Sequence, residues 1–278
     1  FGTESIYSAN SYDGGLEDVF GLDGSTNTYR ELKEADVIFV IGADVPSYYA
    51  MLGVPVRQAI SRGARLLLAA ADGWNGFNFL AHHRAVLEDD TGFLKQALKH
   101  LVTLRETPVE GVLGYEDMVE ALEDVEVGEA ARTFAEEYHG AKRGMIMIDR
   151  ERISVETARL VANIAIVSGH IASESNGVIQ MLQHSNTQAV SLLGIRRNLH
   201  SLQADVDAGK IKGLVLVGQF VPDEMAAKLD YCLMLDSMKG PALAYADAFL
   251  PVPGYGAFPG SYISAEGRVQ RFDAVSYT

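Results

Sequence analysis

Short unbroken apolar runs alternate along this chain with stretches that have helical spacing. The clearest run, Val37–Ile41, leads into Gly42 and then Pro46, and residues 214–217 lead in the same way into Gly218 and Pro222. Apolar runs bounded by turn residues predict strands that are buried on both faces, as in parallel sheets covered by helices. In each of these two segments the Gly permits a tight turn, and the Pro suits the first turn of a following helix. The pattern therefore predicts two similar strand, turn, helix and strand units.

The rest of the chain continues this alternation of strands and helices. Further strands are expected at residues 65–70, 144–148, 178–182, 231–235 and 248–251, and helices at 54–62, 91–103, 153–167 and 223–228, with two short ones within 116–138. This order favours an α/β fold with parallel sheets. We expect two Rossmann-like lobes, residues 1–104 and 141–278, joined by a helical connection at 105–140.

Composition and charge narrow the class of protein. The chain has 278 residues and a formal charge of −14, which opposes binding to the phosphate backbone of nucleic acids. One cysteine, Cys232, cannot form an internal disulfide or hold an iron–sulfur cluster by itself. No stretch approaches about 18 consecutive apolar residues, so we expect no direct membrane insertion. The chain begins without Met, as expected of an excised fragment.

Candidate chemistry is sparse. His82 and His83 are adjacent, which on a helix would not form the same-face pair that binds a metal, and no P-loop or GxGxxG motif occurs. The turns at Gly42 and Gly218 have two interpretations. Each is either a purely structural strand-to-helix turn or a place where backbone N–H groups hold a phosphate, so that two turns facing one crevice would hold a long diphosphate ligand.

The carboxyl-terminal region carries a family resemblance. Ala246 and Asp247 precede Leu250-Pro251, and residues 260–270 read Gly-Ser-Tyr-Ile-Ser-Ala-Glu-Gly-Arg-Val-Gln. This resembles the molybdopterin oxidoreductases, in which Ala-Asp-x-x-Leu-Pro leads to Gly-Thr-x-x-Asn-x-Glu-Gly-Arg-x-Gln. The resemblance implies the α/β domains of the formate dehydrogenase and dimethyl sulfoxide reductase type, which sandwich bis-molybdopterin guanine dinucleotide.

The chain also departs from the catalytic members of that family. Where they have Asp-Pro-Arg after the second strand, this chain has Ala70, Ala71 and Asp72, and Glu88, Asp89 and Asp90 fall where they have Pro-Gly-Thr-Asp. Three acids beside a diphosphate would repel it. The profile is similar to the large iron–sulfur subunit of NADH–quinone oxidoreductase, known as its G subunit.

The leading hypothesis from this resemblance is a scaffold region of such a subunit. It implies no catalytic or metal-binding residue and no cofactor in this fragment, with iron–sulfur clusters in a missing amino-terminal part. The implied partners are other subunits of a membrane-associated respiratory complex, and the implied location is cytoplasmic, peripheral to the inner membrane.

The alternative is a catalytic molybdopterin oxidoreductase such as formate dehydrogenase. It implies that seven residues line one pterin crevice: Gly42, Asp44, Ser185, Asn186, Gly218, Gln219 and Asp236. Both hypotheses make the chain part of an oxidoreductase.

Overall fold

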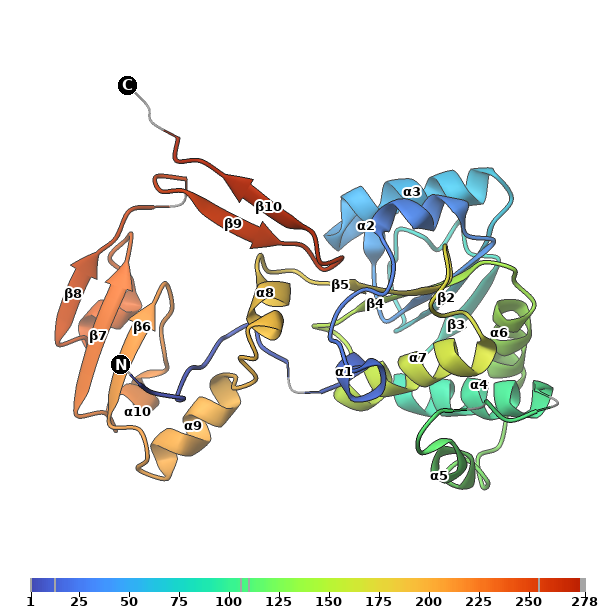
Figure 1. Ribbon diagram of the computed structural model, residues 1–278, viewed down its shortest axis with the longest axis horizontal. Helices are drawn as coiled ribbons and strands as arrows, with labels where there is room; N and C mark the ends of the chain where they lie inside the picture. Colours follow the sequence, from blue (N-terminus) through green and yellow to red (C-terminus); the bar gives the residue numbers. More distant parts are fainter. Residues whose placement is uncertain (1, 13, 106, 110, 255, 276–278) are drawn as a thin grey trace. The chain divides into compact units, whose positions relative to one another are not determined.

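The computed structural model describes residues 2–12, 14–105, 107–109, 111–254 and 256–275 (Figure 1). The chain divides into two compact units. Among the described residues, unit 1 comprises 2–12, 185–264 and 268–275, and unit 2 comprises 14–184 and 265–267.

Unit 2 is built on a five-stranded parallel sheet. Its strands lie in the order β3-β2-β1-β4-β5. They are β1 (Val37–Ile41), β2 (Arg65–Ala70), β3 (His83–Val86), β4 (Gly144–Asp149) and β5 (Gly177–Met181). Strands β1, β4 and β5 are buried along their whole length because helices cover both faces of the sheet, as their apolar runs predicted.

Helices cover the two faces of this sheet in two layers (Figure 1). One layer contains η1 (Tyr29–Glu34), α2 (Val45–Tyr48) and α3 (Ala50–Ser61), and the other contains α1 (Leu16–Phe20), α4 (Asp90–Leu104), α6 (Glu129–His139) and α7 (Val155–Ser168). The side chains of β1 alternate between the layers: Ile38 faces the first core and Phe39 the second. The short α5 (Tyr115–Glu120) precedes α6, so the two helices expected within 116–138 are present.

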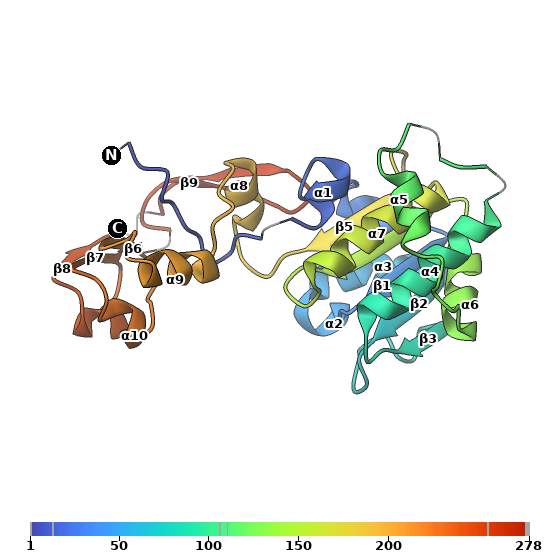
Figure 2. The same ribbon diagram turned by 90° about the horizontal axis from the view of Figure 1, so that it is seen from below.

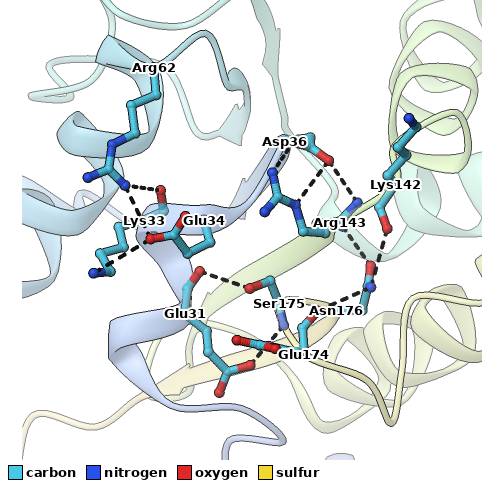
Figure 3. Close-up of polar contacts among 11 residues, drawn as sticks. Glu31, Lys33, Glu34, Asp36, Arg62, Lys142, Arg143, Glu174, Ser175 and Asn176 are labelled. Atoms are coloured by element: carbon cyan, nitrogen blue, oxygen red, sulfur yellow. Dashed lines mark hydrogen bonds and ion pairs between the residues drawn. The ribbon is translucent and has the colours of Figure 1, made fainter.

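Ion pairs and hydrogen bonds close the amino edge of this sheet (Figure 3). Arg143 donates to both carboxylate oxygens of Asp36, with the shorter contact at 2.7 Å, and Glu31 accepts from the backbone N–H of Ser175 at 2.8 Å. An open cleft of about 730 Å³ lies there, lined by η1, Arg143 and Ser175. Among its charged groups, Lys33 pairs with Glu34 and Arg143 pairs with Asp36.

Unit 1 contains a smaller parallel sheet in the order β6-β7-β8, formed by β6 (Gly213–Val217), β7 (Tyr231–Asp236) and β8 (Ala248–Pro251). Its core joins α9 (Leu199–Asp207) and α10 (Asp223–Ala226) to one face of the sheet, through side chains such as Leu202, Met225 and Leu216. Figure 2 shows these two helices on the same side of the strands. The unit also contains α8 (Thr187–Leu192), η2 (Pro241–Ala244) and the antiparallel pair β9 (Gly260–Ile263) and β10 (Val269–Phe272).

The structure confirms the α/β class with parallel sheets, and it divides the chain differently from the expected boundaries at 104 and 141. Strand β4 pairs with β1, so residues 144–181 belong to the sheet of the first expected lobe. Helix α9 was not expected; Asn198 and Ser201 form a capping box at its start. Strand β3, which contains His83, was not expected.

Candidate functional site

The carboxyl edge of the five-stranded sheet is the place where the fold would present a ligand. The strand order reverses direction between β1 and β4, and ligands of open parallel sheets bind at this point, outside the carboxyl ends of the strands. The turn after β1 holds Gly42 and Asp44, and residues 149–152 follow from the end of β4. These two segments therefore define the candidate site in unit 2.

The turn at Gly42 is closed by the protein's own groups. Gly42 has φ of +66°, a conformation that favours glycine, and its N–H donates to the carbonyl of Ala69 at 2.9 Å. A Cβ placed on Gly42 would lie 3.1 Å from Ile153 Cγ2 and 3.4 Å from Asp90 Oδ2. The N–H is thus committed to the sheet, and the space above the turn is taken by a methyl group and a carboxylate.

Acidic side chains surround this turn. Asp44 precedes α2, a helix of four residues, and its Oδ1 accepts the N–H of Gly76 at 3.0 Å. Burial raises the pKa of Asp90, and the charge of Asp89 raises it further. The Asp90 carboxylate lies where a phosphate would approach the turn, and like charges repel. The groups over the Gly42 turn are therefore apolar or acidic, not cationic.

A polar cluster lies on the β4 side of the same edge. The Asp149 carboxylate is fully buried, accepts the N–H of Glu151 at 3.1 Å and lies 3.3 Å from Nε of Arg152. The Arg152 guanidinium in turn lies 4.1 Å from the ring centroid of Tyr48. Burial raises the pKa of Tyr49, and the Asp149 carboxylate contributes to this shift. Because Asp149 neutralises Arg152, the cluster offers no surplus positive charge to an anion.

Sequence reasoning missed this cluster, although a signal was present. Asp149, Arg150, Glu151 and Arg152 follow directly on the apolar run of β4. A parallel strand that ends in consecutive charged residues indicates a ligand-facing edge as well as a Gly turn does.

In unit 1, the other predicted turn residues stand at the carboxyl ends of β6 and β7. The N–H of Gly218 donates to the carbonyl of Leu235 at 2.9 Å, which repeats the arrangement at Gly42 and brings Gly218 beside Asp236. Asp236 Oδ1 accepts the N–H of Met238 at 3.2 Å. Gly218 and Gln219 are exposed.

Two further predicted residues precede α8. Ser185 is exposed, whereas the side chain of Asn186 is used within the fold: its Nδ2 donates to the carbonyl of Ser261 at 3.1 Å, and its Oδ1 accepts the N–H of Ile263 at 2.9 Å. Asn186 thereby links the segment before α8 to strand β9 through two hydrogen bonds. Gly42 and Asp44 belong to unit 2 and the other five residues to unit 1, so their convergence on one crevice stays a prediction.

The two adjacent histidines contact groups of the fold. His82 Nδ1 accepts the N–H of Leu66 at 3.0 Å, and His83 lies 3.5 Å from Glu137. His184 lies 3.7 Å from Glu151 near the polar cluster. Within the described ranges, no three His, Cys, Asp or Glu side chains form a group that could hold a metal ion.

The carboxyl-terminal motif also has a structural role. Gly267 has φ of +78° in the turn between β9 and β10, and the carboxylate of Glu266 accepts the N–H of Tyr29 at 2.8 Å. Burial and this carboxylate raise the pKa of Tyr29 to about 12. The Glu-Gly pair of the motif thus forms a turn and fixes it to η1. In the described part of the chain, no helix is long and apolar enough to cross a bilayer.

Two curated proteins are similar to this chain in sequence. The G subunit of NADH-quinone oxidoreductase of Pseudomonas fluorescens is 24% identical over 87% of this chain and 29% of its own length. The alpha subunit of F420-dependent formate dehydrogenase of Methanocaldococcus jannaschii is 20% identical over 92% of this chain and 46% of its own length. The chain therefore spans less than half of either relative. No family model matches it.

Solved structures show the same fold at low identity. The formyltransferase/hydrolase complex of Methylorubrum extorquens superposes with a TM-score of 0.61 at 14% identity, over 92% of this chain and 74% of that one. Acetylene hydratase of Pelobacter acetylenicus gives a TM-score of 0.66 at 13% identity, over 90% of this chain and 45% of that one. The resemblance drawn from the sequence is thus confirmed: this chain has a molybdopterin oxidoreductase-like α/β fold and is similar in sequence to the NADH-quinone oxidoreductase and formate dehydrogenase subunits named above.

Proposed function

We propose that this chain is a scaffold region of an oxidoreductase subunit, of the type found as the G subunit of NADH-quinone oxidoreductase, and that it binds no molybdenum cofactor of its own. In this role the α/β units provide a framework against which electron-carrying parts of the same protein and neighbouring subunits pack. The similarity to that relative over 87% of the chain supports this assignment.

The observation that carries the proposal is the closed turn after β1. In a nucleotide-binding fold of this type, the backbone at the switch point must approach the diphosphate closely. Here Ile153 and Asp90 occupy that approach, and the Gly42 N–H is already bonded to Ala69. A diphosphate would have to displace a packed side chain and lie beside a carboxylate.

Metal and pterin content test the proposal directly. The intact subunit would be purified from cells that make molybdopterin cofactors, and its molybdenum, tungsten and pterin would be quantified per chain. We expect only trace amounts. An established molybdopterin oxidoreductase produced in the same cells is the control, because it shows that cofactor was available. Stoichiometric molybdenum or tungsten with pterin would overturn the proposal.

A second measurement tests the assembly. A tagged form of the intact subunit would be isolated from its own host under conditions that keep protein complexes assembled. We expect it to migrate in a large assembly together with iron and NADH-oxidising activity. Migration as an isolated chain without iron would contradict the scaffold role.

The alternative function is that of the pterin-binding domains of a catalytic enzyme such as a formate dehydrogenase. It is favoured by the similarity to formate dehydrogenase alpha over 92% of the chain and by the exposure of Gly218 and Gln219. Among the described residues, no atom lies over Gly218 as Ile153 lies over Gly42. The metal analysis separates the two functions, since only this alternative requires bound metal and pterin.

A further inference from the structure

The loop between β2 and β3 holds one aromatic side chain in the core and presents two others outward. Phe77 is fully buried, whereas Trp74 is 74% exposed and Phe79 is 84% exposed. The rings of Trp74 and Phe79 meet edge to face with centroids 6.0 Å apart. Large apolar side chains that stay in solvent as a pair mark an interaction site.

Hydrogen bonds hold the loop in this shape. Asn75 is buried, donates from Nδ2 to the carbonyl of Ala43 at 2.8 Å and accepts the N–H of Phe77 at 3.0 Å. The N–H of Gly76 is bonded to Asp44. The exposed rings therefore stand on an ordered loop, and a partner would not have to order it on binding.

Pro46 of α2 lies against this loop, because a Cβ on Gly76 would lie 2.8 Å from Pro46 Cβ. The loop therefore rests on a helix next to the candidate site. We name the surface formed by Trp74 and Phe79 the aromatic edge.

Acidic groups border the aromatic edge. Asp72 begins the loop with its side chain 88% exposed. Exposed Glu88 lies near the same point, because the N–H of the preceding Leu87 is bonded to the carbonyl of Ala70. The nearby Arg84 lies 3.7 Å from Asp72. The border is therefore net negative, as is the whole chain.

We propose that the aromatic edge docks a protein segment that combines apolar side chains with arginine or lysine. Trp and Phe are enriched at protein interfaces, and a cation over a Trp face adds attraction. The acidic border complements a basic partner and repels nucleic acid and anionic lipid. The proposal rests on the scaffold function only in expecting a protein partner, and its test needs no measurement of metal.

Trp74 makes the test specific, because it is the only tryptophan in the chain. Its fluorescence would be followed while the protein is titrated with an amphipathic peptide of leucine and arginine, and with a matched peptide of leucine and glutamate. We expect the basic peptide alone to shift the emission to the blue and to protect Trp74 from acrylamide quenching. Anionic and zwitterionic phospholipid vesicles form further arms, and neither should cause a shift.

Two variants distinguish docking of the basic peptide at the aromatic edge from its general electrostatic attraction to an acidic protein. Phe79→Ser keeps Trp74 as the fluorescent reporter, and we expect it to raise the Kd of the basic peptide about tenfold. Leu113→Ser, at a position of unit 2 that is 99% exposed, should leave the Kd unchanged. Equal binding by Phe79→Ser and the parent, no shift with the basic peptide, or a shift with vesicles or the acidic peptide would each overturn the proposal.

Discussion

At the scale of single residues, Asp90 places a partly buried carboxyl group beside the turn after β1, and this should affect stability. Burial and the charge of Asp89 raise the pKa of Asp90, so the folded state binds its proton more tightly than the unfolded state does. Stability associated with this group is therefore lost as pH rises through its unfolded and then its folded pKa.

Removing the charge should consequently stabilise the protein. We expect Asp90→Asn to raise the free energy of unfolding at neutral pH by about 0.5–1 kcal/mol, and the gain to vanish at acid pH, where Asp90 is protonated in both states. Urea unfolding across pH measures this. Asp72→Asn, at an exposed position, serves as the control with no gain expected. A loss of stability in Asp90→Asn at neutral pH would contradict the prediction.

A second residue-scale prediction concerns Gly177, at the start of β5. A Cβ there would overlap the side-chain oxygens of Asn27 and Thr26, and Thr26 Oγ1 accepts the N–H of Val178 on the same strand. Gly177→Ala should lower the free energy of unfolding by about 2 kcal/mol or more. Gly53→Ala is the matched control: within α3 a Cβ would meet only Pro46 Cα at an ordinary 3.7 Å, so we expect an unchanged or slightly higher urea midpoint.

At the scale of elements, Glu31 connects η1 to β5 and makes the connection dependent on pH. Burial acts to raise its pKa, but hydrogen bonds from Ser175, Asn27 and Thr28 outweigh it and lower the pKa to about 2, from a usual 4.5. A lowered pKa means that the carboxylate stabilises the folded state above pH 4.5, and that this contribution is lost as pH falls toward 2.

Glu31→Gln should therefore destabilise the protein mainly at neutral pH. We expect a loss of about 1–2 kcal/mol there, reduced for partial solvent screening, and a smaller difference from the parent near pH 3. Chemical unfolding at the two pH values checks this. Glu34→Gln, which removes the exposed ion pairs of Glu34 with Lys33 and Arg62, should cost less than about 0.5 kcal/mol. Equal losses for the two variants would argue against the hydrogen bonds of Glu31 as the cause.

Elements whose signal is local could be predicted from the sequence. The strands at β1, β2 and β8 agree with their apolar runs, and the Gly turns after β1 and β6 have the expected positive φ. Strand β3 was missed because His83 and Arg84 interrupt its apolar pattern. The assignment of β4 and β5 to the first sheet could not be predicted, because pairing with β1 depends on contacts far apart in the sequence.

The turn at Gly42 could be predicted from the sequence, but the groups that cover it could not. The turn at Gly42 was identified from the pattern of strand and glycine, and the acids at 88–90 from the family comparison. That Ile153 and Asp90 cover the turn depends on how α7 and α4 approach it, and no local signal in the sequence encodes that approach. The same is true of Asn186, whose partners lie about 75 residues away.

At the scale of the whole molecule, the two sheets differ in how well they are covered. In unit 2 both faces of the sheet are buried, whereas in unit 1 the helices cover one face only. Val215 and Val217 on the other face of β6 are 60% and 66% exposed, and Leu216 between them is buried. Parallel sheets derive most of their stability from burial of both faces, so unit 1 should be the less stable unit.

Amide hydrogen exchange followed by mass spectrometry tests this difference. We expect peptides from β6 and β7 to exchange at least about tenfold faster than peptides from β1 and β4, because fewer buried contacts oppose their opening. Leu216→Ala, which removes a core side chain, should accelerate exchange throughout β6–β8, since such a change costs about 2–4 kcal/mol. Val215→Ala on the open face is the matched control and should change little. Slower exchange in β6 and β7 than in β1, or an equal response to both substitutions, would contradict the prediction. It would mean that the open face of β6 is protected from exchange to the same degree as the buried face.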